Sequence, residues 1–321
     1  MTSAQFSVII PVYNRPVEIL ELLTSLAKQP FRDFEVIIVE DGSLDRCDRI
    51  AAQFQDKIAI QYFFKQNEGP GPSRNFGFAR ASGKYFIVFD SDCIIPDTYF
   101  PAIVQSLFVN RWDAWGGPDK AHGDFTVLQR AMGYTMSSIL TTGGIRGGTK
   151  SAEAFLPRSF NMGMSREVFI ATQGFNFTHY AEDIELSIRI KKAGFRVGLI
   201  PDAFVYHKRR TTFPQFFRQV FNFGRGRAMV GRAHPGQLKL THWFPTIFFL
   251  GSMSLLVLPL LNVPLAVIGA SLFFLYLLAI FVHAWQESGD LRVSIYAIPS
   301  ALIQLYGYGT GFLSEWLGLR R

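Results

Sequence analysis

The chain has 321 residues and a formal net charge of +7. This length excludes a single small module and allows one large catalytic domain followed by an additional segment. The two cysteines, Cys47 and Cys93, exclude a disulfide framework and a cysteine-rich zinc site, and they are typical of a protein in a reducing compartment.

The N-terminal part of the chain alternates strand and helix patterns. The apolar stretch Phe6–Val12 follows an N-terminus that lacks a positive region, so it predicts a strand and not a signal peptide. A helix is expected from about Pro16 to Lys28, and Ser73 is expected to cap a short helix that ends at Gly83. Further strands are predicted at Phe34–Val39, Ile58–Phe63 and Tyr85–Phe89. This alternation predicts an α/β fold, with a mostly parallel sheet and helices on both faces.

Two aspartates, Asp90 and Asp92, come directly after the last of these strands. Ligands of open α/β sheets bind beyond the carboxyl ends of the strands, so both carboxylates are expected to face a crevice. Carboxylates one residue apart offer oxygen ligands to a hard divalent cation, and a substrate diphosphate and water can supply others. A metal-diphosphate site is therefore one interpretation, and a turn that caps the next helix is the other.

Two more loops leave the same sheet edge, Pro11–Arg15 and Glu40–Ser43, and the three loops together outline a nucleotide crevice. Within them, Asp41 could accept the imide hydrogen of a uracil or the equivalent edge of another base, or it could form an Asx turn. The stretch Asn67–Asn75 offers tight backbone turns and the cation Arg74 near a helix N-terminus, which favour phosphate binding. A plain surface loop is the alternative for that stretch.

In this order and spacing, the motifs resemble those of family 2 glycosyltransferases, which are inverting nucleotide-diphospho-sugar transferases with the GT-A fold. The resemblance covers roughly residues 6–207 and rests on the segments Val8–Arg15, Val39–Ser43, Asn67–Gly69 with Arg74–Gly77, and Phe89–Asp92. It implies that Asp41 reads the base, that Asp90 contacts the donor ribose or the metal, and that Asp92 binds Mg²⁺ or Mn²⁺ on the donor diphosphate. The other expected donor-binding residues are Pro11, Tyr13, Asn14, Asn67, Gly69 and Arg74.

An acidic pair, Glu182 and Asp183, opens a predicted helix that ends at Gly194. The pair resembles the Glu-Asp motif of the family, so Asp183 is expected to be the catalytic base, with Glu182 beside it. Inverting transfer needs a carboxylate that takes the proton of the acceptor hydroxyl, and a helix N-terminus favours the ionised form. The same position also suits a plain helix cap.

His207 follows the strand-like stretch Ala203–Tyr206. In similar transferases a histidine near this place can complete the metal site, and His207 is expected to do so. The alternative is an exposed residue at the start of a basic stretch, because a hard cation does not require an imidazole ligand.

The segment 208–242 is strongly basic and has no acidic residue. Phenylalanines alternate with arginines in it, which predicts an amphipathic interfacial helix attracted to anionic lipid headgroups. A helix packed under the catalytic domain is the alternative, and nucleic acid is not an expected partner. The basic residues are Lys208, Arg209, Arg210, Arg218, Arg225, Arg227, Arg232 and Lys239.

The residues that follow predict membrane helices, because 240–286 contains no Asp, Glu, Lys or Arg. Two spans are expected, at 243–261 and 263–285, with Trp243 and Trp285 at interfacial positions. A third uncharged segment, 293–314, could cross, re-enter or lie flat. Positive residues stay on the cytoplasmic side, so we expect a multi-pass protein of the cytoplasmic membrane with its catalytic domain in the cytoplasm.

Three parts are therefore predicted: a catalytic domain at 1–207, a basic interfacial segment at 208–242 and a membrane region at 243–321. The chain lacks the Gln-x-x-Arg-Trp motif of processive synthases. We expect transfer of one sugar (a hexosyltransferase type of reaction) to a hydroxyl of a membrane-associated acceptor, with a lipid-linked glycan as the leading candidate. The rival interpretations are transfer directly onto polyprenyl phosphate, a nucleotidyltransferase, and a catalytically silent membrane scaffold.

Overall fold

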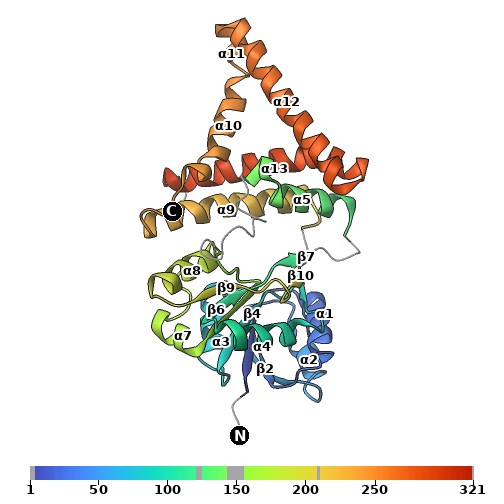
Figure 1. Cartoon of the computed structure of the whole chain (residues 1–321), viewed down its shortest axis with the longest axis vertical. Coiled ribbons are helices and arrows are strands. Elements are labelled where there is room, and N and C mark those ends of the chain that lie inside the picture. The colour runs from blue at the N-terminus through green and yellow to red at the C-terminus, as the bar shows by residue number, and fades with distance from the viewer. Residues whose placement is uncertain (1–3, 121–124, 143–154, 208–209, 320–321) are drawn as a thin grey trace. The chain divides into compact units, whose positions relative to one another are not determined.

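The computed structural model describes residues 4–120, 125–142, 155–207 and 210–319 (Figure 1). The chain divides into two compact units: unit 1 is Met1–His122 with Lys150–Lys208, and unit 2 is Gly123–Thr149 with Arg209–Arg321. A segment inside the predicted catalytic domain, 123–149, therefore belongs to the second unit. Lys208 and Arg209 of the predicted basic stretch lie outside the described residues.

Unit 1 is built on a seven-stranded sheet in the order β3-β2-β1-β4-β8-β6-β9. Strand β8 pairs antiparallel with β4 and β6, and the other neighbours pair in parallel. The sheet is thus mostly parallel, as the sequence predicted. Its strands are β1 (Phe6–Val12), β2 (Phe34–Asp41), β3 (Ala59–Lys65), β4 (Tyr85–Phe89), β6 (Ala114–Gly116), β8 (Asn161–Ser165) and β9 (Val197–Leu199).

Helices cover both faces of this sheet because apolar residues point alternately to either side of its strands. In β1, Val8 and Ile10 pack on one face and Ile9 packs on the other. The first face is covered by α1 (Pro16–Ala27), α2 (Asp48–Ala52) and α4 (Tyr99–Asn110). The second face is covered by α3 (Pro70–Phe78), α7 (Arg166–Thr172) and α8 (Glu182–Lys192).

A small second sheet stands at the edge of unit 1. It has the order β5-β10-β7, with β5 (Cys93–Ile94), β7 (Asp119–Lys120) and β10 (Val205–His207). Strand β10 pairs antiparallel with β5, which sets His207 opposite Cys93. Residues far apart in the sequence thereby meet at the end of β4.

The predicted helix after the third strand differs from the observed one. Helix α3 begins at Pro70 and ends at Phe78, so Ser73 is not its cap. Gly69 precedes it with a φ of 98°, a conformation that glycine adopts without steric cost. Ser73 lies inside the helix and its hydroxyl donates to the Gly69 carbonyl. Proline at the first helical position decides this start, because it has no N–H to leave unsatisfied.

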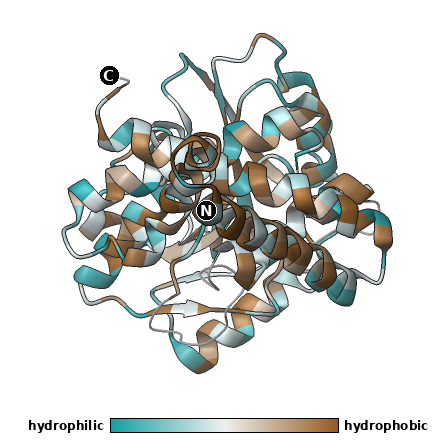
Figure 2. Cartoon of the chain, turned by 90° about the horizontal axis from the view of Figure 1, so that it is seen from above, coloured by the Kyte–Doolittle hydropathy of each residue, from teal (hydrophilic) through white to brown (hydrophobic). Residues whose placement is uncertain are grey.

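Unit 2 is helical. Its elements are α5 (Val127–Ser137), α6 (Ile139–Thr142), α9 (Phe213–Ala233), the 3₁₀ helix η2 (Leu240–His242), α10 (Phe244–Ser254), α11 (Leu258–Leu261), α12 (Val263–Ser288) and α13 (Leu291–Trp316). Helices α10, α11 and α12 form a hairpin whose residues are mostly hydrophobic (Figure 2). Helix α9 packs along α13, so the predicted amphipathic helix buries Phe216 and Val220 within unit 2.

The predicted multi-pass arrangement is not supported. Among the described residues, only Val263–Ser288 is a helix long and apolar enough to cross a membrane. The first predicted span, 243–261, is interrupted between α10 and α11, and α10 alone has 11 residues. The third segment forms one continuous helix, α13, which is not apolar enough to count as a span.

Candidate functional site

The carboxyl ends of β1, β2 and β4 meet at one edge of the sheet, because these strands run in parallel and in register. The residues that follow them are the predicted donor and metal residues. Asp90 and Asp92 follow β4, Asp41 ends β2, and Tyr13 and Asn14 follow β1. The sequence therefore predicted correctly which loops share an edge.

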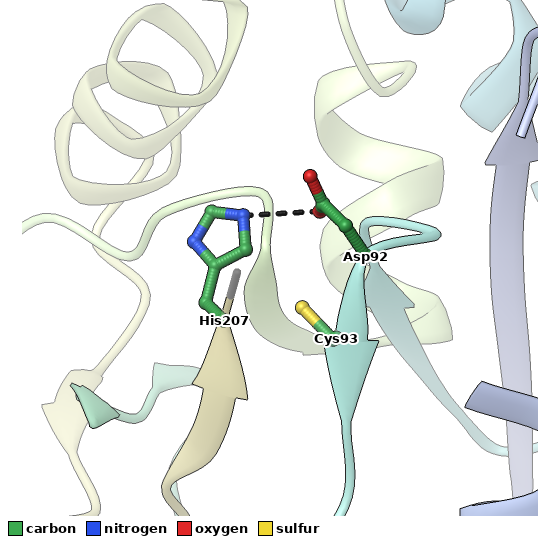
Figure 3. Close-up of side chains that lie close together, drawn as sticks. All are labelled: Asp92, Cys93 and His207. Atoms are coloured by element: carbon green, nitrogen blue, oxygen red, sulfur yellow. Dashed lines mark hydrogen bonds and ion pairs between the residues drawn. The ribbon is translucent and has the colours of Figure 1, made fainter. Parts of the chain in front are cut away.

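Asp92 lies between two cationic or ionisable partners. Its Oδ2 accepts a hydrogen bond from Arg15 at 2.6 Å, and its Oδ1 lies 3.1 Å from Nε2 of His207 (Figure 3). The ring of Phe160 stacks on the imidazole, with 5.0 Å between ring centroids. Burial lowers the pKa of His207, but Asp92 and then Asp90 outweigh it and leave the pKa above its usual value. The structure thus brings His207 to the aspartate that the sequence predicted as its partner.

The donor atoms around Asp92 fit a divalent cation. Asp92, Cys93 and His207 each offer one ligand atom, and these atoms lie within 4.8 Å of one another. Burial raises the pKa of the Cys93 thiol well above its usual value, so the thiol stays protonated and is a poor ligand for a hard cation. Carboxylates suit Mg²⁺ and Mn²⁺. Asp92 and His207 are therefore the residues of this cluster that could hold such an ion, and Asp90, the other predicted ligand, is not part of the cluster.

Arg74 connects this part of the site to α8. The side chain is 3% exposed; Nη2 donates to Asp90 at 2.9 Å and Nη1 donates to Glu182 at 2.7 Å. Its Nε has no hydrogen-bond partner among the described residues. The sequence predicted Arg74 as a phosphate ligand, whereas in the structure both terminal nitrogens are committed to carboxylates.

The acidic pair lies at the start of α8, as the sequence predicted. Oδ2 of Asp183 accepts a hydrogen bond from the Ser159 backbone N–H at 3.3 Å and lies 3.6 Å from Nε of Arg158. Ala181, just before the helix, has a φ of 53°, which turns the chain sharply into α8. Burial raises the pKa of Glu182 to about 7; Arg74 opposes this rise and Asp183 adds to it.

Asp41 is buried and already has several protein partners. Its carboxylate accepts from Lys65 at 2.6 Å, from the Glu68 N–H at 3.0 Å and from the Gly69 N–H at 2.8 Å. Burial raises its pKa, but Lys65 and the backbone donors outweigh burial and lower it overall. The Ser73 side chain also hydrogen-bonds to this carboxylate. Since a carboxylate has about four acceptor positions, the protein itself engages most of them.

Two neighbours of Asp41 shape the same end of the site. Asn67 donates its side-chain amide to the Asp41 carbonyl at 2.9 Å. Asn14 has a φ of 51°, and its Oδ1 accepts from the Leu44 N–H at 2.8 Å, which ties the first loop to the second. Pro11 lies within β1 opposite Val39, and the Tyr13 side chain is 53% exposed. Asn14 is thus occupied in loop structure, and Tyr13 is the accessible side chain.

Three residues that contact the site were not predicted from the sequence: Arg15, Lys65 and Arg158. Each is a cation next to a predicted acidic site residue. Arg15 ends the motif Val8–Arg15, and Lys65 lies two positions after the predicted strand Ile58–Phe63, so their charge was a usable signal. Arg158 is separated from Asp183 by 25 positions in sequence, and only the fold brings them together.

The sequence profile of the family described as Glycosyl transferase family 2 matches residues 7–171, half of the chain. The chain belongs to glycosyl transferase family 2. This membership confirms the resemblance seen in the motifs and the predicted class of enzyme, a glycosyltransferase.

Individual relatives of this family 2 chain cover different shares of it. An uncharacterized glycosyltransferase of Rickettsia conorii is 41% identical over 92 residues, which is 29% of this chain and 15% of that protein. The chain thus matches only a small part of the length of such relatives. The succinoglycan biosynthesis protein ExoA of Rhizobium meliloti is 26% identical over 333 residues, covering 100% of this chain and 98% of that protein.

Solved structures confirm the predicted GT-A fold. The mannosyltransferase PcManGT of Pyrobaculum calidifontis, in complex with GDP-Man and Mn²⁺, has a TM-score of 0.63 at 17% identity and covers 95% of this chain and 88% of its own. TarS 1–349 of Staphylococcus aureus in complex with UDP-GlcNAc has a TM-score of 0.51 at 20% identity, with 98% and 92% covered. At these identities the likeness concerns the fold alone.

Proposed function

We propose that this family 2 chain is a membrane-anchored inverting glycosyltransferase that moves one sugar from a nucleotide-diphospho-sugar to a hydroxyl of a membrane-associated acceptor. A lipid-linked glycan is the favoured acceptor, and the catalytic domain faces the cytoplasm. The observation that carries the proposal is the bridge made by Arg74. It holds Asp90, at the donor end, and Glu182, beside the candidate base, within one side chain's reach.

The donor end binds the nucleotide through the loops after β1 and β2. Asp41 reads the base, and its lowered pKa keeps it ionised as an acceptor at neutral pH. Asn67 and Gly69 hold Asp41 in place through its carbonyl and carboxylate. Tyr13 is exposed beside this loop and can stack on the base. Pro11 and Asn14 fix the course of the loop that carries Tyr13.

Asp90, Asp92 and His207 are proposed to hold Mg²⁺ or Mn²⁺ on the donor diphosphate. A bound divalent cation would offset the negative charge that develops on the departing diphosphate. Arg15 donates to Asp92, and Arg74 donates to Asp90. These arginines orient the two carboxylates toward the end of β4. The PcManGT structure named above contains Mn²⁺, which supports a metal in this fold.

Asp183 is the proposed base that takes the proton of the acceptor hydroxyl. The backbone N–H of Ser159 and the guanidinium of Arg158 lie beside its Oδ2. Both contact the same carboxylate oxygen and so fix the orientation of the side chain. Glu182 does not face the acceptor in this proposal. It holds Arg74, and through Arg74 it fixes the position of α8 relative to Asp90.

The role of Asp183 is tested by the Asp183→Asn variant, assayed by transfer of labelled sugar from nucleotide sugars to the lipid fraction of the source organism. We expect the transfer rate to fall by about 100-fold or more, since general bases contribute on that order, while donor affinity stays unchanged. Asp202→Asn, at an exposed position of the same unit, is the matched control and should transfer normally.

Other outcomes of the same assay point to the rival functions. Full activity of Asp183→Asn with a product on polyprenyl phosphate would identify polyprenyl phosphate, and not a hydroxyl, as the acceptor. An acceptor that is already anionic needs no base. Transfer of the nucleotide itself would identify a nucleotidyltransferase. A wild-type protein that is folded but binds no nucleotide would favour the scaffold interpretation.

A further inference from the structure

The hairpin of unit 2 exposes apolar side chains along both of its limbs. In the described residues of α12, only Ala266, Ile280 and Ala284 are buried. Exposure is greatest at the tip, where Leu256 is 74% exposed, Leu260 84% and Leu261 77%. A contiguous apolar surface of this size is unfavourable in water and marks an interaction site. No Asp, Glu, Lys or Arg occurs from position 240 to 286. The chemistry of this surface matches lipid hydrocarbon.

Several backbone N–H groups at the tip bond within the hairpin itself. The N–H groups of Leu256, Val257 and Leu260 donate to carbonyls three residues earlier. The side chain of Asn262, the only polar residue of the turn, accepts from the Leu265 N–H at 3.0 Å and caps α12. Such closure is required of backbone in hydrocarbon, where water cannot supply partners. A turn that emerged among the headgroups on the far side would not need it.

Prolines and serines near the tip follow the same rule. Pro259 and Pro264 stand in the first turns of α11 and α12, where an N–H would lack a partner, and proline has none. The hydroxyls of Ser252 and Ser254 donate to the carbonyls of Phe249 and Gly251. These two hydroxyls are thus directed inward, toward the backbone of the hairpin.

Helices α9 and α13 pack together at the base of the hairpin and run in the same direction (Figure 1). Phe213 contacts Tyr296 near their beginnings, and Arg225 and Arg232 both pair with Glu315 near their ends. Between these points, Gly224 lies against the backbone of Tyr308 and Phe312. The two helices therefore have the same tilt in any membrane.

Helix α9 cannot enter hydrocarbon at low cost. It carries Arg218, Arg225, Arg227 and Arg232, and each arginine costs about 2.5–3.5 kcal/mol at the centre of a bilayer. Since α13 is packed along α9, it does not cross either. Tryptophans stand at the base of the hairpin, just before α10 and near the end of α12. Trp243 contacts Trp316 with ring centroids 5.1 Å apart, and Trp285 is 53% exposed. Tryptophan prefers the interface between hydrocarbon and headgroups.

We propose that the α10–α12 hairpin is a re-entrant membrane anchor, with its tip from Leu256 to Val263 inside the hydrocarbon, and that α9 and α13 lie at the level of the headgroups. The partner of this surface is one face of a bilayer with anionic lipids, which the exposed Arg218, Arg232 and Lys239 attract. Both ends of the helical unit then stay on one side of the membrane. The proposal rests on the membrane attachment in the proposed function, and not on the identity of donor or acceptor.

Single-cysteine labelling tests this arrangement in the full-length protein. The native Cys47 and Cys93 are buried, so the unsubstituted protein is the blank. Leu260→Cys reports the tip, Gln286→Cys the base of α12 and Leu319→Cys the end of α13, and all three positions are exposed. A membrane-impermeant maleimide is applied to right-side-out vesicles, to inside-out vesicles and to protein in detergent, and donor binding is measured on the same samples.

We expect Gln286→Cys and Leu319→Cys to react in the same vesicle orientation, and Leu260→Cys to react only in detergent. Reaction of Leu260→Cys in the opposite orientation would show a two-pass hairpin and overturn the proposal. So would its reaction together with Gln286→Cys, which would place the hairpin outside the membrane. Reaction of Leu319→Cys from the opposite side would show that α13 crosses.

A spin label at Leu256→Cys gives an independent readout of depth. We expect collisions with oxygen, which concentrates in hydrocarbon, to exceed those with a water-soluble nickel complex. The reverse order would contradict the re-entrant tip. Donor binding by the same samples reports on the proposed function and not on the membrane topology. The substitutions lie in unit 2, outside the unit that holds the candidate donor site.

Discussion

At the scale of single residues, Arg74 has an unusual position because it is almost fully buried between two carboxylates that serve different parts of the site. Asp90 belongs to the loop after β4 and Glu182 to the start of α8. Asp90 and Glu182 together raise the pKa of the arginine, although burial lowers it. Arg74 stays charged at every relevant pH. It is a positioning residue for the donor end and for the candidate base.

Replacing Arg74 tests this positioning role. Arg74→Gln leaves the buried carboxylate of Glu182 and the partly buried one of Asp90 without their cation. Removing one partner of a buried ion pair costs about 3–5 kcal/mol. Arg74→Lys keeps the charge but lacks the fork that reaches both carboxylates. We expect Arg74→Lys to recover much of the unfolding free energy and little of kcat. Thermal unfolding and steady-state kinetics measure the two effects, and equal recovery of both would argue against positioning.

The raised pKa of Glu182 predicts a pH dependence of stability. The folded protein binds a proton at Glu182 with a pKa of about 7, against an ordinary value of 4.5. This proton stabilises the fold fully below about pH 4.5, and the contribution is lost as the pH rises through about 7. We expect Glu182→Gln to remove a fall in unfolding free energy on the order of 1–3 kcal/mol across this range.

Urea unfolding at pH 5, 6, 7 and 8 measures that dependence. Glu167→Gln, at an exposed position in α7, is the control and should keep the slope of the wild-type protein. An unchanged slope in Glu182→Gln would show that its carboxyl ionises normally in the folded state.

At the scale of elements, α13 depends on three glycines that let other helices approach closely. A Cβ at Gly311 would overlap the carbonyl of Phe221 in α9, and one at Gly307 would meet the side chain of Val220. On another side, Gly309 lies against Pro245 of α10, and its carbonyl accepts from Thr246 at 3.2 Å. This spacing of glycines is the reason why α13 packs against both α9 and the hairpin.

The glycine contacts give a stability prediction. We expect Gly311→Ala to destabilise unit 2 by about 1–3 kcal/mol, because a backbone carbonyl cannot move aside as a side chain can. Gly251→Ala is the matched control, since a Cβ there meets nothing within 4 Å. It should be neutral or slightly stabilising, as alanine is a better helix former. Protease resistance in detergent measures both, and equal resistance of the two variants would contradict the close packing.

The same scale shows where sequence patterns were insufficient. Phe6–Val12 and Tyr85–Phe89 were predicted to the residue, because a buried strand is a continuous apolar run between turn residues. The interruption between α10 and α11 was not predicted, because hydropathy does not register where a helix breaks inside an apolar run. The course of α13 depends on its packing against α9, which no local pattern encodes.

At the scale of the whole molecule, charge and hydropathy are segregated along the chain. The net charge of +7 arises mainly from the basic stretch at 208–242, and an uncharged stretch follows it. This order predicts attachment to an anionic membrane surface, but it does not indicate how deeply the chain enters the membrane. The proposed depth rests on the hydrogen bonds of the tip and on the pairing of α9 with α13.

Much of the candidate site could be predicted because its residues sit in short motifs at the ends of strands. Asp90 and Asp92 follow β4 by simple adjacency, and Asp41 ends β2. The distance between such motifs is not encoded locally. The bridge from Asp90 to Glu182, and the approach of Arg158 to Asp183, depend on long-range packing. The roles assigned to these residues stay predictions until they are measured.

The central claim is metal-dependent binding of a nucleotide-sugar donor, and calorimetry tests it most directly. Detergent-solubilised protein is titrated with UDP, GDP, dTDP and CMP in Mn²⁺, and again with excess chelator, together with the Asp92→Asn variant. We expect preferential binding of one nucleotide diphosphate that is lost with chelator and strongly weakened in the variant. Binding of none of them by folded protein, or binding that neither chelator nor Asp92→Asn affects, would contradict the account.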